Sequence, residues 1–301
     1  MSLLRIAGVD GCPGGWVAVR AEIRLGPAAG PASAGAGDAA GSEMGAPSPF
    51  PIRLAGPAGR TGHSALTVHL TALTIHAVRL TRFAELFESE EAPQVVAVDM
   101  PIGLPARTGA RGRAPERLVR PLLGERQSSV FSIPSRAAVE AGVAPGVPED
   151  ERYRNACAIA RATSETGRAV AKQGFHIFPK IAEIDALLRE RRQLVDIVYE
   201  CHPEVVFWAM NGGAPLPLAK KVANRPHPPG LEFRRKLLED KGFPPELVSA
   251  TAARALRVGP DDLVDAAASA WTACRIAAGV ALGFPDPPER DAHGMPIAIR
   301  V

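Results

Sequence analysis

The chain has 301 residues, of which 46% are hydrophobic and 22% are charged, a balance typical of a globular protein with a sizeable core. Its formal net charge of +3 is too small to identify a nucleic-acid partner, so the local distribution of charge has to decide that question. The cysteines are scattered without a Cys-x-x-Cys pair, which argues against a structural zinc site and against a disulfide framework. The N-terminus lacks the apolar core of a signal peptide, and the most apolar long stretch contains Asp265 and Arg275. We therefore expect a cytoplasmic protein without a membrane span.

The chain opens on a strand that ends in an acidic residue. Leu3–Val9 is mostly apolar, Asp10 follows, and a Gly/Pro turn precedes a second β-rich run at Trp16–Val19. This pattern predicts a β-hairpin with the Asp10 carboxylate at its mouth. An Asp in an apolar strand needs compensation by turn hydrogen bonds or by a metal ion. Both interpretations stand at this point, because Asp-Gly is also a common turn dipeptide.

A low-complexity segment follows the hairpin. Residues 26–62 consist mainly of Gly, Ala, Pro and Ser, so they cannot bury enough surface to offset the entropy lost on ordering. We expect a disordered insertion there. The alternating run at 64–70 predicts a third strand, and residues 77–89 are expected to form a helix.

A second strand that ends in an acidic residue follows. Val95–Val98 is continuously apolar, which suits a central strand buried on both faces, and Asp99 comes directly after it, before a Pro/Gly turn. Packing alone does not readily explain two central strands that both end in a carboxylate. The repetition favours a common acidic site for Asp99 and Asp10.

The region from 104 to 192 is expected to be a largely helical insertion. Amphipathic spacing predicts helices at 150–166 and 180–192. Arginine is abundant between 104 and 140, which suits a phosphate-bearing substrate, although a solvated Arg-rich helix explains the pattern equally well. The candidate substrate-binding residues are Arg113, Arg117, Arg126, Lys172 and Lys180.

Short strands and helices alternate in the last third of the chain. Strands are expected at 195–200 and 296–301, and helices at 203–212, 230–241, 245–257 and 259–282. The last helix carries Asp262 and Asp265 on one face, one turn apart, whereas Asp261 has a simple interpretation as a cap. Ala-rich sequence after Asp265 lets this helix approach a sheet closely. Such an approach brings its carboxylates towards the two strand ends.

Four carboxylates that lie close together need cations to remain ionised. Oxygen-rich sites of this kind suit Mg²⁺ or Mn²⁺, and two such ions about 3.5–4 Å apart activate a water and stabilise the leaving oxygen of a phosphodiester. In this hypothesis Asp10 bridges the two metals, and Asp99 and Asp265 each complete a metal shell. Asp262 shares or orients the last ligand. The predicted metal ligands are therefore Asp10, Asp99, Asp262 and Asp265.

A further acidic pair precedes the helix at 203–212. Glu204 or Glu200 is expected to hold a metal-bound water or the second ion, and Glu204 joins the four aspartates as a candidate catalytic residue. His202 is a candidate proton shuttle, with a packed or capping histidine as the alternative.

The order of these elements resembles that of the ribonuclease-H-like superfamily, and the sequence from Asp262 to Ala267 is similar to the corresponding helix of Holliday-junction resolvases. More closely, the chain resembles the DUF429 family, a domain of unknown function described as a predicted RNase-H-like nuclease. The matching pieces are Gly8–Trp16, Asp99–Pro105, Ser128–Phe131, Lys172–Phe175, Pro179–Ile181, His202–Glu204, Phe207–Trp208 and Asp262–Trp271. The resemblance implies an α/β fold with a ribonuclease-H-like mixed β-sheet flanked by helices, in a single domain over residues 1–301.

Three functions follow from these patterns. The leading hypothesis is a nuclease dependent on Mg²⁺ or Mn²⁺ that hydrolyses phosphodiester bonds of nucleic acid, DNA or RNA. An actin-like ATP-binding or phosphotransferase domain shares the sheet topology, but it needs a second Gly-rich phosphate loop, and the chain offers no convincing pair. The third is a catalytically silent nucleic-acid-binding module of the same fold. Nucleic acid is the expected partner, no membrane is expected, and the oligomeric state is left open, a homodimer included.

Overall fold

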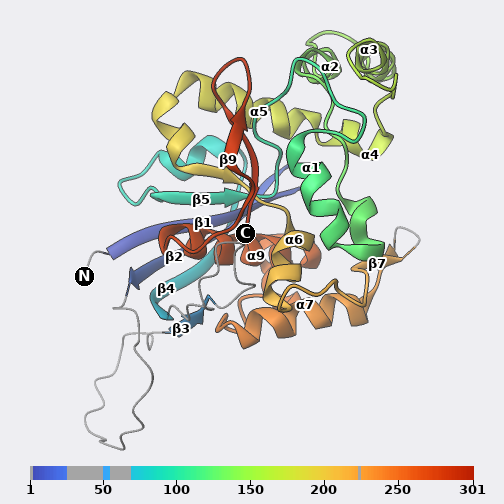
Figure 1. Ribbon diagram of the computed structural model, residues 1–301. Coiled ribbons are helices and arrows are strands. Elements are labelled where there is room, and N and C mark those ends of the chain that lie inside the picture. The colour runs from blue at the N-terminus through green and yellow to red at the C-terminus, as the bar shows by residue number, and fades with distance from the viewer. Residues whose placement is uncertain (1–2, 26–49, 55–68, 223–224) are drawn as a thin grey trace, which may run out of the picture.

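The computed structural model describes residues 3–25, 50–54, 69–222 and 225–301 (Figure 1). Most of the predicted insertion at 26–62 and most of the predicted strand at 64–70 lie outside the described residues. Within the predicted insertion, however, residues 50–53 form a strand. This strand was not predicted, because it is short and surrounded by low-complexity sequence.

A six-stranded mixed sheet forms the centre of the molecule, in the order β3-β4-β2-β1-β5-β6. Its strands are β1 (Leu3–Cys12), β2 (Gly15–Leu25), β3 (Phe50–Arg53), β4 (His69–Leu80), β5 (Val95–Val98) and β6 (Val198–Glu200). The β1–β2, β2–β4 and β3–β4 pairs are antiparallel, whereas β1–β5 and β5–β6 are parallel. Two small two-stranded sheets add β7 (Lys221–Val222) with β8 (Arg225–Pro226), and β9 (Gly283–Arg290) with β10 (Pro296–Arg300).

Helices flank the sheet. They are α1 (Ala114–Val119), α2 (Arg136–Gly142), α3 (Glu149–Ala162), α4 (Lys172–His176), α5 (Phe178–Glu190), α6 (Pro203–Met210), α7 (Pro228–Asp240), α8 (Ala250–Leu256) and α9 (Pro260–Ala277). Short 3₁₀ helices are η1 (Phe83–Phe87), η2 (Arg120–Leu122), η3 (Gly124–Ser129) and η4 (Arg192–Asp196). The predicted mixed sheet flanked by helices is thus confirmed. Among the described helices, none combines the length and the apolar character that a membrane span requires.

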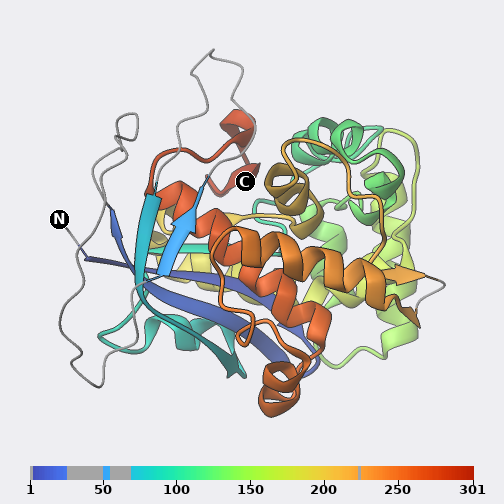
Figure 2. The same cartoon turned by 90° about the horizontal axis from the view of Figure 1, so that it is seen from below.

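The sheet separates two hydrophobic cores. One core contains buried residues of α6, α7, α8 and α9, and the other contains those of α2, α3, α5 and η1 (Figures 1 and 2). Successive residues of β1 point to opposite faces: Ile6 belongs to the first core and Ala7 to the second. Strand β5 is paired on both sides, which confirms the central strand predicted from its continuous apolar run.

Helix α9 lies directly on β1. A Cβ atom at Gly8 would lie 1.8 Å from the backbone nitrogen of Ala270 and 2.4 Å from the backbone oxygen of Ala266. Only a glycine on the strand and small residues on the helix permit this distance. The close approach predicted from the Ala-rich sequence after Asp265 is therefore present, and it brings the start of α9 to the ends of β1 and β5.

Several predicted elements have other bounds in the structure; the helix expected at 245–257, for example, covers only Ala250–Leu256. The helix expected at 77–89 is wrong, because β4 continues to Leu80 in register with β2 and only Phe83–Phe87 forms a 3₁₀ helix. The strand expected at 195–200 is confined to its last three residues, since η4 occupies the preceding ones. Helix α9 ends at Ala277 rather than near Leu282, because Gly279 adopts a φ of +69° and turns the chain.

Candidate metal centre

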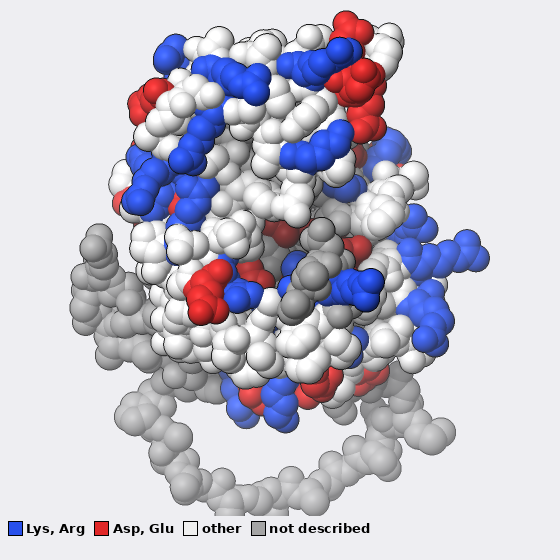
Figure 3. Space-filling view, turned by 90° about the vertical axis from the view of Figure 1, so that its right-hand side faces the viewer, with Lys and Arg blue, Asp and Glu red and all other residues white. Residues whose placement is uncertain are grey.

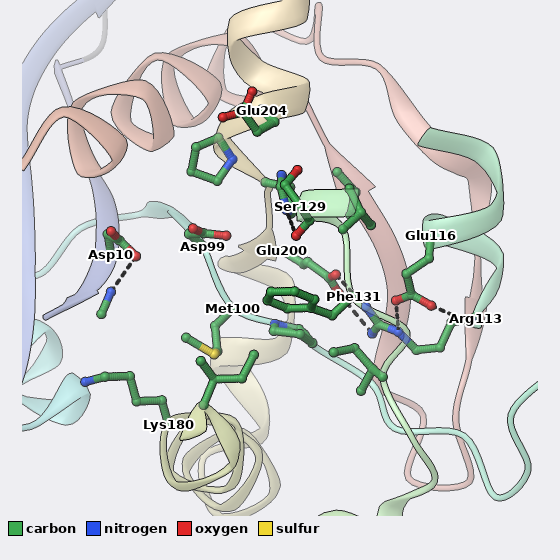
Figure 4. A pocket seen from close by; sticks show the side chains of 18 of the residues that line it. Asp10, Asp99, Met100, Arg113, Glu116, Ser129, Phe131, Lys180, Glu200 and Glu204 are labelled. Carbon is green, nitrogen blue, oxygen red and sulfur yellow. Dashed lines mark hydrogen bonds and ion pairs between the residues drawn. The ribbon is translucent and has the colours of Figure 1, made fainter. Parts of the chain in front are cut away.

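Three carboxylates converge where β1 and β5 end beneath α9. Asp10 lies near the end of β1, Asp99 directly follows β5, and Asp265 lies in the second turn of α9. One oxygen of each residue lies within 4.8 Å of those of the other two. Figure 4 shows Asp10 and Asp99 on the same side of the cavity that they line. The parallel pairing of β1 with β5 and the Gly8 contact with α9 together produce this arrangement.

Burial and mutual repulsion make these carboxylates unusual acids. Burial, followed by the charges of Asp99 and Asp265, raises the pKa of Asp10 well above its ordinary value. Burial and the neighbouring Asp265 raise the pKa of Asp99 to about 7. Like charges held close together away from water favour protonation or the binding of a cation. The cluster therefore requires a proton or a positive ion near neutral pH.

Lys220 supplies one positive charge to this cluster. Its Nζ donates to Oδ2 of Asp265, and the side chain is 31% exposed, against 2% for Asp265. Burial alone lowers the pKa of Lys220, but Asp265 and Asp10 raise it above its ordinary value. The other oxygen of Asp265, Oδ1, is buried without a hydrogen-bond partner among the described residues. The cluster thus contains a built-in cation and still has an unused oxygen.

Asp262 lies apart from this group. Of the four predicted metal ligands, the structure brings Asp10, Asp99 and Asp265 together, and among the described residues Asp262 is not part of the cluster. Its Oδ2 accepts a hydrogen bond from the backbone nitrogen of Gly259 at 3.3 Å, across the first turn of α9. Burial and the neighbouring Asp261 raise the pKa of Asp262 to about 6. The geometry gives Asp262 a capping hydrogen bond, and its role as a metal ligand stays a prediction.

The two candidate glutamates have different environments. Glu200 forms an ion pair of 2.6 Å with Arg113 and accepts a hydrogen bond from the backbone nitrogen of Ile102 at 2.8 Å. Glu204, at the start of α6, accepts from Nη2 of Arg234 at 2.5 Å through Oε1 only, and its buried Oε2 has no partner among the described residues. Both line the same cavity, but only Glu204 has an oxygen free for further interaction.

Arg113 lines the cavity, but its guanidinium group is buried and engaged by neighbouring residues. Its side chain is 1% exposed and donates to Oε1 of Glu116 at 2.7 Å and to both carboxylate oxygens of Glu200. It also donates to the backbone oxygens of Ile102 and Gly103. The sequence did not indicate this pairing, because a basic residue in an Arg-rich segment can contact a substrate or neutralise buried carboxylates, and its position does not distinguish the two roles.

The other predicted substrate contacts are distributed over the surface. Lys180 lines the cavity, donates to the backbone oxygen of Gly15 and lies 4.3 Å from the centroid of the Trp16 ring. Lys172 pairs with Glu149 at 3.3 Å, and Arg126 pairs with Glu125 at 3.4 Å. Arg117 is exposed on α1. Only Lys180 of these four lies among the residues that line the cavity.

A cavity of about 310 Å³ opens beside the three aspartates. Its walls are largely apolar and include Met100, Val130, Phe131, Ile133 and Ile177. Figure 3 shows the hollow on the face that carries α1 and β7, with acidic side chains inside it and Lys and Arg side chains around it. The charge distribution thus places carboxylates within a hollow whose surroundings attract anions.

Sequence reasoning missed Lys220. It precedes Asp265 by 45 residues in a segment between helices, and the Lys-Lys pair there resembles any solvated loop. A paired lysine and a free lysine look the same in a single sequence, so no signal in the chain identified it.

A model of one protein family, described as "Protein of unknown function (DUF429)", matches residues 8–290. No curated protein and no solved structure gives a significant match to the chain. The matched range contains all three aspartates of the cluster, together with Glu204 and Lys220.

Proposed function

Since this chain belongs to the DUF429 family of proteins of unknown function, we propose for it the activity that its own acidic cluster supports best: divalent-metal-dependent hydrolysis of phosphodiester bonds in nucleic acid. The observation that carries the proposal is the convergence of Asp10, Asp99 and Asp265 within 4.8 Å. A ribonuclease-H-like fold is part of the same proposal. It is supported by carboxylates at the ends of two adjacent parallel strands and on a helix that crosses them.

The cluster fits a hard divalent ion. Carboxylate oxygens are the ligands that Mg²⁺ and Mn²⁺ prefer, and Oδ1 of Asp265 is buried without a hydrogen-bond partner among the described residues. Burial and the neighbouring carboxylates raise the pKa values of Asp10 and Asp99. A cation between these carboxylates would relieve their repulsion. The ammonium group of Lys220 already neutralises part of the negative charge, through its ion pair with Asp265.

The residues around the cluster supply the other functions that the reaction needs. Bound divalent metal would activate a water molecule and stabilise the leaving oxygen of the phosphodiester. Asp10, Asp99 and Asp265 would hold it. Glu204 is fixed through one oxygen by Arg234, so its second oxygen is free to orient the attacking water and accept its proton. Lys220, once released from Asp265, would donate to a phosphate oxygen.

A cleavage assay with metal and a matched pair of variants tests the proposal. Purified protein is incubated with labelled single-stranded, duplex and branched DNA and RNA in Mg²⁺, Mn²⁺ or a chelator. We expect cleavage of at least one substrate in the presence of metal, and loss of this cleavage in Asp10→Asn. Asp261→Asn is the control, because Asp261 lies on the same helix as Asp265 but pairs with Lys221 at 2.7 Å, outside the cluster. Equal cleavage by wild type and Asp10→Asn would refute the proposal.

A further inference from the structure

The cavity beside the aspartates is larger and more apolar than metal binding requires. It extends from Asp10 and Asp99 past Met100 to the buried pair of Arg113 and Glu200 (Figure 4). Its volume of about 310 Å³ lies at the lower end of the range of roughly 300–1,000 Å³ found for small-molecule sites. A metal centre alone would not explain this apolar hollow, so the cavity points to a further occupant.

Phe131 is the unusual residue in its wall. The ring belongs to neither hydrophobic core, whereas the other phenylalanines whose side chains the structure describes pack in one of them. Phe131 is partly exposed and forms no ring pair with another described aromatic residue. In Figure 4 it lies between Asp99 and the Arg113–Glu116 pair. An aromatic ring that contributes to no core and lines a cavity is a suitable stacking surface for a flat ligand.

The polar groups at the far end of the cavity are already paired. Arg113 is engaged by Glu116, Glu200 and two backbone oxygens, so this wall is rigid and offers little hydrogen bonding to a ligand. His202 is the exception: Nε2 lies 3.4 Å from the backbone oxygen of Ser129 and Nδ1 has no partner among the described residues. Recognition here therefore depends mainly on stacking and enclosure.

We propose that this cavity binds a single unstacked nucleobase, that of the nucleotide whose phosphate lies at the three aspartates, with Phe131 as the stacking surface. The inference rests on the proposed nuclease function and narrows its substrate. A base can enter a hollow of this size only after it has left the helical stack, so the protein acts on unpaired nucleotides or strand ends and not within continuous duplex. Because stacking accepts every base, discrimination among the four bases is weak.

The test is a double-mutant cycle between protein and substrate. Binding of a short single-stranded oligonucleotide is measured by fluorescence anisotropy, with Ca²⁺ in place of Mg²⁺, for wild type and Phe131→Ala. Phe131→Ala is expected to weaken binding by roughly 5- to 100-fold. An abasic nucleotide, scanned along the strand, should produce a similar loss at one position, and Phe131→Ala should add nothing further to that loss. The inference would be overturned if the losses from Phe131→Ala and from the abasic nucleotide multiply at every position, or if Phe131→Ala binds as tightly as wild type.

Two control variants separate stacking from folding. Phe131→Tyr keeps the ring and is expected to bind like wild type. Leu118→Ala removes an apolar side chain that is 44% exposed on α1, outside the cavity, and should leave binding unchanged. If Phe131→Tyr binds as weakly as Phe131→Ala, the ring is not the stacking surface and the inference fails.

Two further measurements identify the source of the base and separate this inference from the function on which it rests. A mononucleotide that competes as strongly as the oligonucleotide assigns the cavity to a free nucleotide, whereas weak competition assigns it to a polynucleotide. If wild type cleaves in Mg²⁺ or Mn²⁺ but Phe131→Ala does not weaken oligonucleotide binding, the base site alone is refuted. A Phe131-dependent loss of binding without any cleavage by wild type refutes the nuclease and retains the base site.

Discussion

Replacement of Lys220 by methionine removes the ammonium group that contacts Asp265 and neutralises part of the charge on Asp10 and Asp99. Methionine retains much of the apolar stem, so the substitution changes the charge more than the packing. In the absence of metal, the three carboxylates then repel one another without an internal cation. We expect Lys220→Met to be less stable than wild type without metal and to bind divalent ions more tightly.

The magnitude follows from the burial of the pair. Removal of one partner from a fully buried ion pair typically costs about 3–5 kcal/mol. The Lys220 side chain is 31% exposed, so solvent screening reduces the expected loss in the free energy of unfolding to about 1–3 kcal/mol. Because a divalent ion no longer has to displace the ammonium group, its affinity should increase by at least about tenfold, or 1.4 kcal/mol.

Thermal unfolding with and without Mn²⁺ measures both effects. At one Mn²⁺ concentration, 100 times the Kd of wild type, binding adds about 2.7 kcal/mol of stability to wild type. A tenfold lower Kd adds about 1.4 kcal/mol more, so Mn²⁺ should raise the Tm of Lys220→Met more than that of wild type. Lys221→Met is the matched control, because Lys221 is the next residue but pairs with Asp261. An identical response to Mn²⁺ in both variants would show that Lys220 does not compete with the metal, and our reasoning would be wrong.

Three further predictions address the frame of the site. Gly8→Ala should lower the free energy of unfolding, measured by urea denaturation, by about 1–3 kcal/mol or more, because its Cβ would overlap the backbone of α9. Gly174→Ala is the control and should be nearly neutral, because its Cβ would meet no atom within 4 Å. Equal effects would contradict the close helix–strand contact. Arg234→Met should cost about 3–5 kcal/mol in the same assay, because it leaves the buried Glu204 unpaired, and additional replacement of Glu204 by Gln should restore most of that loss. In metal-free buffer the free energy of unfolding should fall as pH rises from about 4 towards 7. The pKa of Asp99 is raised to about 7 from an unfolded value of 3.8, so the folded state binds the proton more tightly. The pH dependence of Tm should be shallower in Asp99→Asn, and an equally steep profile would contradict this assignment.

The elements that carry the acidic cluster were predictable because each has a strong local pattern. The apolar runs before Asp10 and Asp99 gave β1 and β5, and the Ala-rich helix around Asp265 indicated close packing on a sheet. Convergence of Asp10 and Asp99 followed from topology, since parallel neighbouring strands end at the same edge, and the close packing of α9 on β1 adds Asp265. The capping hydrogen bond of Asp262 was not predicted, because residues three apart share a helix face and this spacing does not distinguish a capping carboxylate from a ligand.

The remaining features depend on long-range contacts that no local pattern encodes. Arg113 is buried because Glu200, 87 residues away, lies opposite it. Lys220 reaches Asp265 only through the fold. The end of β4 was mistaken for a helix because its hydrophobic spacing is ambiguous over a few residues, and pairing with β2 decides the outcome. Charged residues were therefore harder to place than apolar runs.

The contact between Gly8 and α9 also determines the spacing of the carboxylates in the proposed metal site, and therefore the ionic radius that would fit between them. No side chain separates the strand from the helix at this point, so main-chain atoms fix how far Asp265 stands from Asp10. Repacking of either core would leave that spacing unchanged. A larger residue at position 8, 266 or 270 would lift the helix and widen the triangle of carboxylates, which would shift its preference from Mg²⁺ towards the larger Ca²⁺. In the proposed metal site, ionic-radius selectivity would thus depend on three small residues that are not themselves ligands.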